Sequence, residues 1–237
     1  MAVETLAAAE VVDLAVTPLR DLNQRLHDVA GDDPQPQRWQ IVNPNGAHAV
    51  ACGIDAPLEV EILGHVGYYC AGMNKRATVR VRGNAGTGLA ENMMSGTVVV
   101  EGNVSQSAGA TGRGGLLVVH GSAAARCGIS MKGVDIVVRG SIGHMSAFMA
   151  QRGCLVVCGD AGEALGDSIY EAHLYVRGGV ASLGADCVEK ELRDNHVAEL
   201  RSLLERAGFD DLDPGEFRRY GSARELYNFK VDNAGAY

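Results

Sequence analysis

The chain has 237 residues, with 21 Lys and Arg against 29 Asp and Glu, so its formal net charge is −8. This mild acidity argues against nucleic acid or an anionic membrane as a partner, because both select for clustered Lys and Arg. No window approaches about 18 consecutive apolar residues, and the first residues lack the basic-then-apolar order of a signal peptide. We therefore expect a soluble cytoplasmic protein whose six cysteines are free thiols rather than a disulfide framework.

The composition departs from the ordinary in one respect. Glycine supplies 31 of the 237 residues, about 13%, which is roughly twice the usual share near 7%. Only four Phe and one Trp accompany it, whereas small aliphatic residues are plentiful. The core is therefore expected to be built from small aliphatic side chains at close spacing.

The first predicted element is an N-terminal helix. From Pro18 to Ala30 the apolar residues Leu19, Leu22 and Leu26 fall on one side of a helix. The acidic, Pro-containing stretch 31–38 is typical of a linker. Residues 1–38 are therefore expected to form a helix and a linker ahead of the main domain.

A repeat of 19 residues dominates residues 39–190. It is marked by a run of evenly spaced glycines: Gly64, Gly83, Gly102, Gly121, Gly140, Gly159 and Gly178. Relative to each glycine, positions −4, −2 and +2 are apolar in every copy, and position +7 is always Ala or Gly. Apolar residues at −4 and −2 with a freer residue between them show the two-residue period of a β-strand.

Identical strands that recur at a fixed interval pair in parallel with their own copies, about 4.8 Å apart. The sequence therefore predicts an all-β domain, a single-stranded parallel β-helix of about seven to eight coils. The absence of a six-residue sub-period favours the right-handed form. The repeat glycine is expected to allow positive φ and close approach of neighbouring coils, and the +7 column to mark a wall close to the axis.

The two ends of the repeat are expected to be closed by other elements. Before the first full coil, Ile41 and Ala47 fit the −4 and +2 columns of a degenerate capping coil. Residues 191–237 are expected to form a helix over 194–207, ended by Gly208, and an aromatic-containing tail from 210 to 237 that docks in extended form on this body or on a partner.

One outward column is too apolar to be left in water. Position −3 is charged in the first coils but then carries a stripe of five large apolar residues: Val99, Val118, Val137, Val156 and Tyr175. A patch of this size normally has a purpose. Two occupants are possible, the 194–207 helix of the same chain or another subunit, so these five residues form the candidate interface stripe.

Motifs of catalysis and cofactor binding are sparse in this sequence. Cys154 and Cys158 lack the CxxC spacing of a zinc or iron–sulfur site, and the segment 83–88 resembles a phosphate loop but occupies an ordinary coil corner with no helix after it. Four methionines at +9 or +10 indicate a stacked core ladder or, alternatively, the lining of a small-molecule passage: Met73, Met93, Met131 and Met149. We therefore expect no catalytic, cofactor-binding or metal site in this chain.

The glycine-rich corners after Val-rich strands resemble the β-helix domain that closes the large subunit of glutamate synthase, with a related form in formylmethanofuran dehydrogenases. The segments 64–67, 83–86, 140–143 and 159–162 carry this likeness. The opening at 14–23 and the tail at 224–229 look similar to the stand-alone β-helix subunit of the N-methylglutamate synthase family.

That resemblance implies a non-catalytic structural subunit in a hetero-oligomer that makes N-methylglutamate from methylamine and glutamate. It implies two partners, an amidotransferase-like subunit and an FMN-dependent glutamate-synthase-like subunit, with FMN and an iron–sulfur cluster in a partner. The alternatives are the same role in a glutamate-synthase-like or formylmethanofuran-dehydrogenase-type complex, or a free-standing β-helix enzyme, which would need a polar cluster on one face.

Overall fold

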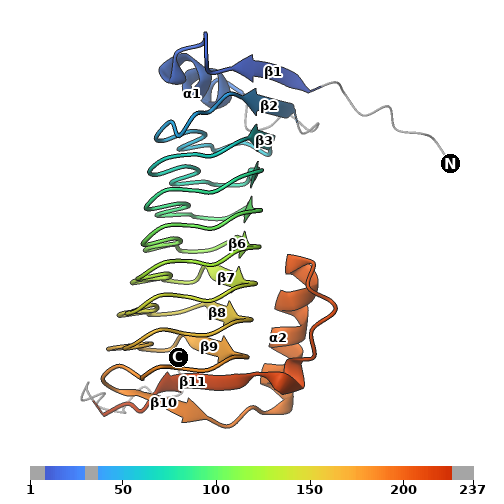
Figure 1. Ribbon diagram of the computed structural model, residues 1–237. Helices are drawn as coiled ribbons and strands as arrows, with labels where there is room; N and C mark the ends of the chain where they lie inside the picture. The colour runs from blue at the N-terminus through green and yellow to red at the C-terminus, as the bar shows by residue number, and fades with distance from the viewer. Residues whose placement is uncertain (1–8, 30–36, 226–237) are drawn as a thin grey trace, which may run out of the picture.

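The protein is an elongated stack of coils, seen here in a computed structural model that describes residues 9–29 and 37–225 (Figure 1). Eight strands, one per coil, pair in parallel with their neighbours along the stack. They are β2 (Arg38–Val42), β3 (Glu59–Leu63), β4 (Thr78–Val81), β5 (Thr97–Val100), β6 (Leu116–Val119), β7 (Asp135–Val138), β8 (Cys154–Val157) and β9 (His173–Val176). The predicted parallel β-solenoid of about seven turns with a 19-residue period is confirmed, while its right-handedness stays a prediction.

Shorter elements lie at the two ends of this stack. At the N-terminal end are β1 (Glu10–Asp13) and α1 (Leu19–His27). At the C-terminal end are β10 (Cys187–Lys190), α2 (Asp194–Ala207), the 3-10 turn η1 (Pro214–Glu216) and β11 (Arg218–Ser222). Together the strands form one sheet in the order β1 to β9, then β11, then β10. No helix within residues 9–29 and 37–225 is long and apolar enough to cross a membrane.

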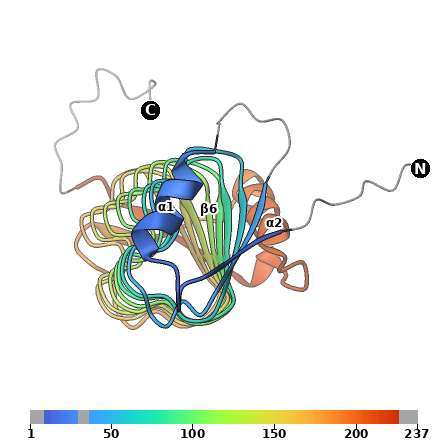
Figure 2. The same cartoon turned by 90° about the horizontal axis from the view of Figure 1, so that it is seen from above.

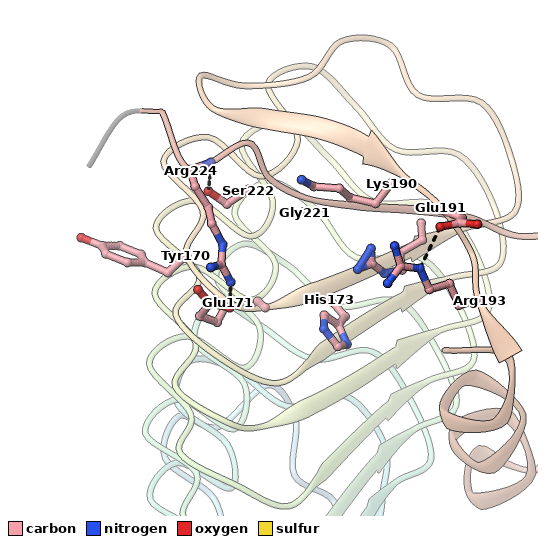
Figure 3. Close-up of a pocket in the computed structure, with 11 residues that line it drawn as sticks. Tyr170, Glu171, His173, Lys190, Glu191, Arg193, Gly221, Ser222 and Arg224 are labelled. Atoms are coloured by element: carbon pink, nitrogen blue, oxygen red, sulfur yellow. Dashed lines mark hydrogen bonds and ion pairs between the residues drawn. The ribbon is translucent and has the colours of Figure 1, made fainter. Parts of the chain in front are cut away.

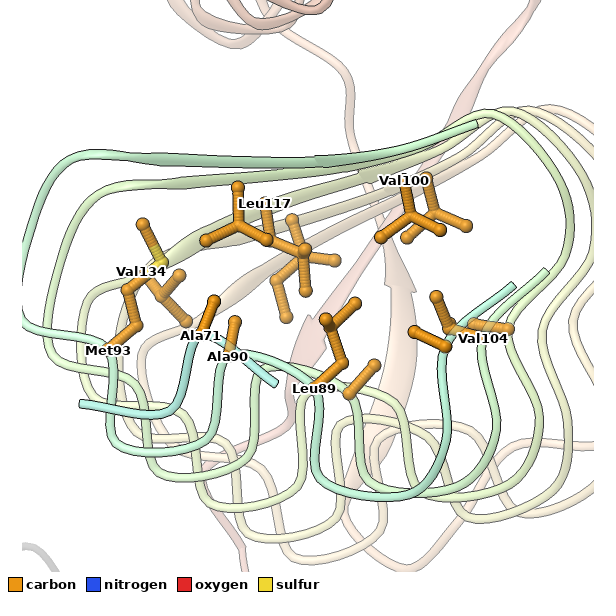
Figure 4. Packing of buried hydrophobic residues seen from close by; sticks show 14 of the residues in the cluster. Ala71, Leu89, Ala90, Met93, Val100, Val104, Leu117 and Val134 are labelled. Carbon is orange, nitrogen blue, oxygen red and sulfur yellow. The ribbon is translucent and has the colours of Figure 1, made fainter. Parts of the chain in front are cut away.

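The core consists of side-chain columns that run the length of the stack (Figure 4). From β3 to β9 the −4 residues pair in register, as Val79 with Val98, and all are buried. The −2 residues are also buried in every coil, as at Val100 and Val119. On the opposite side of the coil, the +2 residues form a second parallel ladder through bridges such as Val104 with Ala123. Stacking like residues lets aliphatic side chains fill the interior of the coils, and the aromatic residues of this core, Trp39 and Tyr220, lie at its two ends.

The repeat glycines are required by close backbone approach rather than by positive φ. Among the seven, Gly64 alone has a positive φ. A Cβ on Gly121 would lie 2.6 Å from the carbonyl oxygen of Gly102 in the preceding coil. The Gly121 N–H also donates to that oxygen at 3.0 Å. The expectation of tight coil packing is confirmed, whereas the expected positive φ is wrong for the other six.

Beside the glycines a ladder of polar side chains, not predicted from the sequence, runs along the stack. At position +1, each side chain accepts a hydrogen bond from the backbone N–H of the same position in the next coil. Asn103 Oδ1, for example, accepts from the Ser122 N–H at 2.8 Å, and Ser122 Oγ accepts from the Ser141 N–H at 3.1 Å. The ladder contains His65, Asn84, Asn103, Ser122, Ser141 and Asp160. It satisfies backbone donors where the chain turns away from the strand.

The far side of each coil has an unusual backbone, with left-handed residues at alternating positions. In one coil Arg126, Gly128 and Ser130 have φ of 60°, 69° and 52°. The N–H groups of Arg126 and Ser130 donate to the following coil, and that of Gly128 donates to the preceding coil. A left-handed non-glycine residue costs about 1–2 kcal/mol, so these inter-coil hydrogen bonds must offset the strain. In the first six coils the small residue at +7 is buried and has this left-handed conformation, whereas Ala185 in the last coil is exposed.

Two expectations about register and packing are wrong. Ile41 pairs with Ile62 in the −2 column rather than with the −4 column, because the corner between Val42 and Ala47 contains two more residues than later corners. The methionines also divide: those at +10, Met93 and Met131, are fully buried, whereas those at +9, Met73 and Met149, are exposed. They therefore form neither a single core ladder nor one continuous lining.

Each end of the core is closed by a different device. Helix α1 lies across the N-terminal coil (Figure 2) and buries Leu22 and Leu26 completely. Its Asn23 side chain donates to the Ala49 carbonyl and accepts from the Ala51 N–H, at 2.8 and 3.0 Å. The helix begins at Leu19 and ends at His27, within the predicted range.

At the C-terminal end, β11 pairs antiparallel with both β9 and β10 and so interrupts the parallel stack. The expectation that the tail docks in extended form on this body is confirmed for Arg218–Ser222. Of the predicted linker at 31–38, residues 31–36 lie outside the described residues, whereas Arg38 begins β2. The tail from 226 onward also lies outside them.

The glycine column gives a direct stability prediction. Gly121→Ala is expected to destabilise the protein by about 1–3 kcal/mol, because its Cβ would overlap Gly102 and the Asn103 side chain. Gly215→Ala is the control, since its Cβ would meet nothing closer than 3.4 Å. Urea unfolding measures the free energy of unfolding of both variants. An equal decrease in the two would contradict the explanation that Gly121 is required by the close approach of the Gly102 backbone.

Candidate functional site

The candidate interface stripe is covered by α2 of the same chain. All five of its members, Val99 to Tyr175, are buried, at 6% exposure or less. They pack in one cluster with the inner face of α2, formed by Leu200, Leu203, Leu204 and Ala207. Of the two occupants considered from the sequence, the structure therefore shows the helix. The stripe is an intramolecular contact and not a free surface for another subunit.

The path of α2 follows the stack, so one helix spans several coils (Figure 1). It ends at Gly208, as predicted, with φ of 75° and a hydrogen bond from the Phe209 N–H to the Leu204 carbonyl. Phe209 then packs against His120 with the two rings perpendicular. Phe217 is buried in the same cluster and completes the cover.

The outer face changes character where the helix stops. On β3 and β4, and just after β4 and β5, the outward side chains form ion pairs instead of an apolar stripe. Arg80 and Arg82 contact Glu101 at 2.7 and 3.2 Å, and Arg82 also contacts Glu61 at 2.7 Å. These groups are partly exposed, and such pairs contribute little to stability.

A polar cluster lies at the other edge of the covered face. Position −5 carries Asp135, Cys154 and His173 on three successive strands. Cys154 is the register partner of His173. Glu199 approaches from α2, and its carboxylate contacts His173 Nδ1 at 2.8 Å and accepts a hydrogen bond from the Tyr175 hydroxyl. One donor atom each from Cys154, His173 and Glu199 lies within 4.8 Å of the other two.

The electrostatics of this cluster are strongly perturbed. The hydrogen bond from His173 is the main cause that lowers the pKa of Glu199 to about 2, so this carboxylate is charged at neutral pH. Burial, with the negative charges of Glu199 and Asp135, raises the pKa of the Cys154 thiol well above its usual range. Burial also raises the pKa of Tyr175 and of Asp135. In this form Cys154 is a protonated thiol and not an activated nucleophile.

A cavity of about 300 Å³ opens beside His173 (Figure 3). Its walls come from β9 and the coil before it, from β10 and β11, and from the segment that leads into α2. Two ion pairs cross its rim, Arg224 with Glu171 at 2.9 Å and Arg193 with Glu191 at 2.7 Å. Of the polar cluster, His173 lines this cavity, which is open to solvent.

The spacing of the cysteines did not point to this cluster, because no two of them are arranged as CxxC. Cys158 lies elsewhere on the face, with Arg139, Arg177 and Asp211 as its charged neighbours. The −5 column contains the signal for two of the three groups, since Cys154 and His173 are 19 residues apart. Nothing in the repeat indicated Glu199, because it belongs to a helix outside the repeat.

The covering helix gives a second stability prediction. Leu200→Ala is expected to cost about 2–5 kcal/mol, because Leu200 is fully buried against the stripe. Arg201→Ala, at an exposed neighbouring position, should change the free energy of unfolding by less than about 0.5 kcal/mol. Thermal unfolding of both variants, followed with a dye that binds exposed apolar surface, gives the change in melting temperature of each. Equal changes in the two variants would contradict tight docking of α2.

Comparison with known proteins shows the relationships of the chain. No protein-family model matches the sequence. Protein GlxC of Rhizobium meliloti (strain 1021) is 64% identical over 227 residues, which cover 96% of this chain and 99% of the relative. The alignment therefore includes the coils, α2 and the polar cluster together. With this identity over nearly the whole of both chains, the protein belongs to the family of Protein GlxC.

Proposed function

We propose that this chain is a structural subunit of a multi-subunit enzyme related to glutamate synthase, and specifically of an N-methylglutamate synthase. It would hold an amidotransferase-like subunit against an FMN-dependent synthase-like subunit, with the FMN and the iron–sulfur cluster in the partner. The proposal draws on the resemblance of the coil corners and of the segments 14–23 and 224–229. It is consistent with the solenoid fold.

The observation that carries the proposal is the uniform rod itself. Strands β2 to β9 are hydrogen-bonded from end to end, and every coil adds about 4.8 Å, so seven steps span roughly 34 Å. Stacked aliphatic columns fill its interior, and α1 and β11 close its ends. Such a body is suited to keeping two other proteins at a set separation.

A fixed distance between the two partner subunits would serve the chemistry of the proposed complex. A volatile amine that is released at one site and consumed at another must not escape to solvent. Holding the two sites in one geometry turns a bimolecular encounter into a local transfer, and small displacements of the reacting groups are costly. The proposed role is therefore positioning, with the bond-making steps carried out by the partner subunits.

Reconstitution tests the assembly. The chain should co-purify with the two larger subunits when all three are co-expressed. Only the complete complex, and not any one of its subunits, should form N-methylglutamate from methylamine and glutamate. Turnover by the isolated chain would overturn the structural role. Formation of glutamate or oxidation of formylmethanofuran by the complex would instead support one of the two alternative complexes.

Removing one coil tests the spacer role. Deletion of residues 78–96 joins Ala77 to Thr97 in the same register and shortens the rod by about 4.8 Å, without touching α2 or the stripe. Product formation by the complex should fall by about 100-fold or more. The control is Arg80→Ala, which removes the Arg80–Glu101 ion pair but keeps the length. A shortened rod that folds, assembles and supports full turnover would contradict the proposal.

A further inference from the structure

We propose that Cys154, His173 and Glu199 form a binding site for one zinc-class divalent metal ion, which fastens α2 to strands β8 and β9.

The placement of the three groups is close to that of a metal centre. Their donor atoms, Sγ, an imidazole nitrogen and a carboxylate oxygen, all lie within 4.8 Å of one another. In a tetrahedral zinc site, bonds of about 2.0–2.3 Å put ligand atoms roughly 3.3–3.8 Å apart. Shifts of about 1 Å or less would therefore bring the three atoms onto one ion.

The backbone already supports this arrangement. Cys154 and His173 are register partners on adjacent parallel strands, so their Cα atoms are held at the strand spacing. Glu199 lies on α2, which is fixed against the same face by Leu200 and Leu203. Two ligands thus come from the rigid sheet and the third from the helix that covers it.

The donor set selects the class of ion. Thiolate and imidazole favour zinc and similar transition metals, whereas magnesium and calcium prefer sites made of oxygen alone. Three protein ligands leave a fourth position for water or for Asp135, which lies on the preceding strand β7 and accepts a hydrogen bond from the Cys154 N–H at 3.3 Å. The Tyr175 hydroxyl, which donates to Glu199, would orient that carboxylate from outside the metal.

Hydrogen bonding alone does not explain why a cysteine occupies position 154. A cysteine S–H is a poor donor, yet Cys154 is buried beside the carboxyl groups of Glu199 and Asp135. A divalent cation would convert this arrangement into strong ionic bonds. The way in is open, because about a third of the His173 and Glu199 side chains is exposed and His173 lines the cavity.

Metal titration of the full chain, purified without a histidine tag and stripped with a chelator, tests the site. Calorimetry with ZnCl₂ should give one ion per chain, and thermal unfolding should shift upward with zinc. With CoCl₂ the protein should develop a cysteinate-to-cobalt charge-transfer band in the near ultraviolet. A wild-type chain that binds no stoichiometric zinc would overturn the proposal.

Variants identify the ligands. Cys154→Ser should abolish the charge-transfer band and weaken zinc binding by about 100-fold or more. Cys158→Ser, at another buried thiol of the same face, is the matched control and should bind as the wild type does. Because a change at buried Cys154 could loosen packing, His173→Gln, at a partly exposed residue, should weaken binding similarly in a fully folded chain. Unchanged affinity in both Cys154→Ser and His173→Gln would show that zinc binds elsewhere.

Discussion

The structure depends on the approach of one coil's backbone to the next. At the repeat glycines a Cβ would lie well inside contact distance of the neighbouring coil, as at Gly121 over Gly102. This contact holds the corners at the same spacing as the hydrogen-bonded strands, so every column stays in register. On the other side of the coil, left-handed residues turn their N–H groups alternately to the coils before and after. The strain of that backbone is tolerated because both neighbours supply acceptors.

A regular stack creates two problems that elements outside the repeat resolve. Its ends expose core columns and unpaired strand edges, which invite further pairing. Helix α1 covers the first coil with Leu22 and Leu26, and antiparallel β11 ends the parallel stacking after β9. The apolar outer stripe is the second problem, and α2 covers it over several coils. The charged outer face near β3 and β4 then remains in contact with solvent.

The same covering helix, α2, contributes a carboxylate that completes the polar cluster on the stack of coils. Repetition alone places like residues above one another, which builds a core but seldom a mixed set of functional groups. Glu199 meets Cys154 and His173 because α2 crosses the columns, and its carboxylate is held charged by His173. The resulting cluster lies at the end of the rod where β9, β10, β11 and α2 converge, beside the cavity lined by His173. The proposed metal and the proposed positioning role are independent, since one concerns the docking of a helix and the other the length of the stack.

The sequence by itself determined the period, the parallel strands and the buried −4 and −2 columns, because each rests on local spacing repeated along the chain. It also determined the N-terminal helix and the end of α2 at Gly208, because each rests on a local helical pattern or on the glycine that ends it. It left open what covers Val99 to Tyr175, and it put Ile41 in the wrong column, since two extra corner residues shift the register without changing the local pattern. The insertion of β11 between β9 and β10 and the meeting of Glu199 with Cys154 were decided by tertiary structure alone. Contacts between residues outside the repeat depend on where the chain returns in space, and no periodicity records that path.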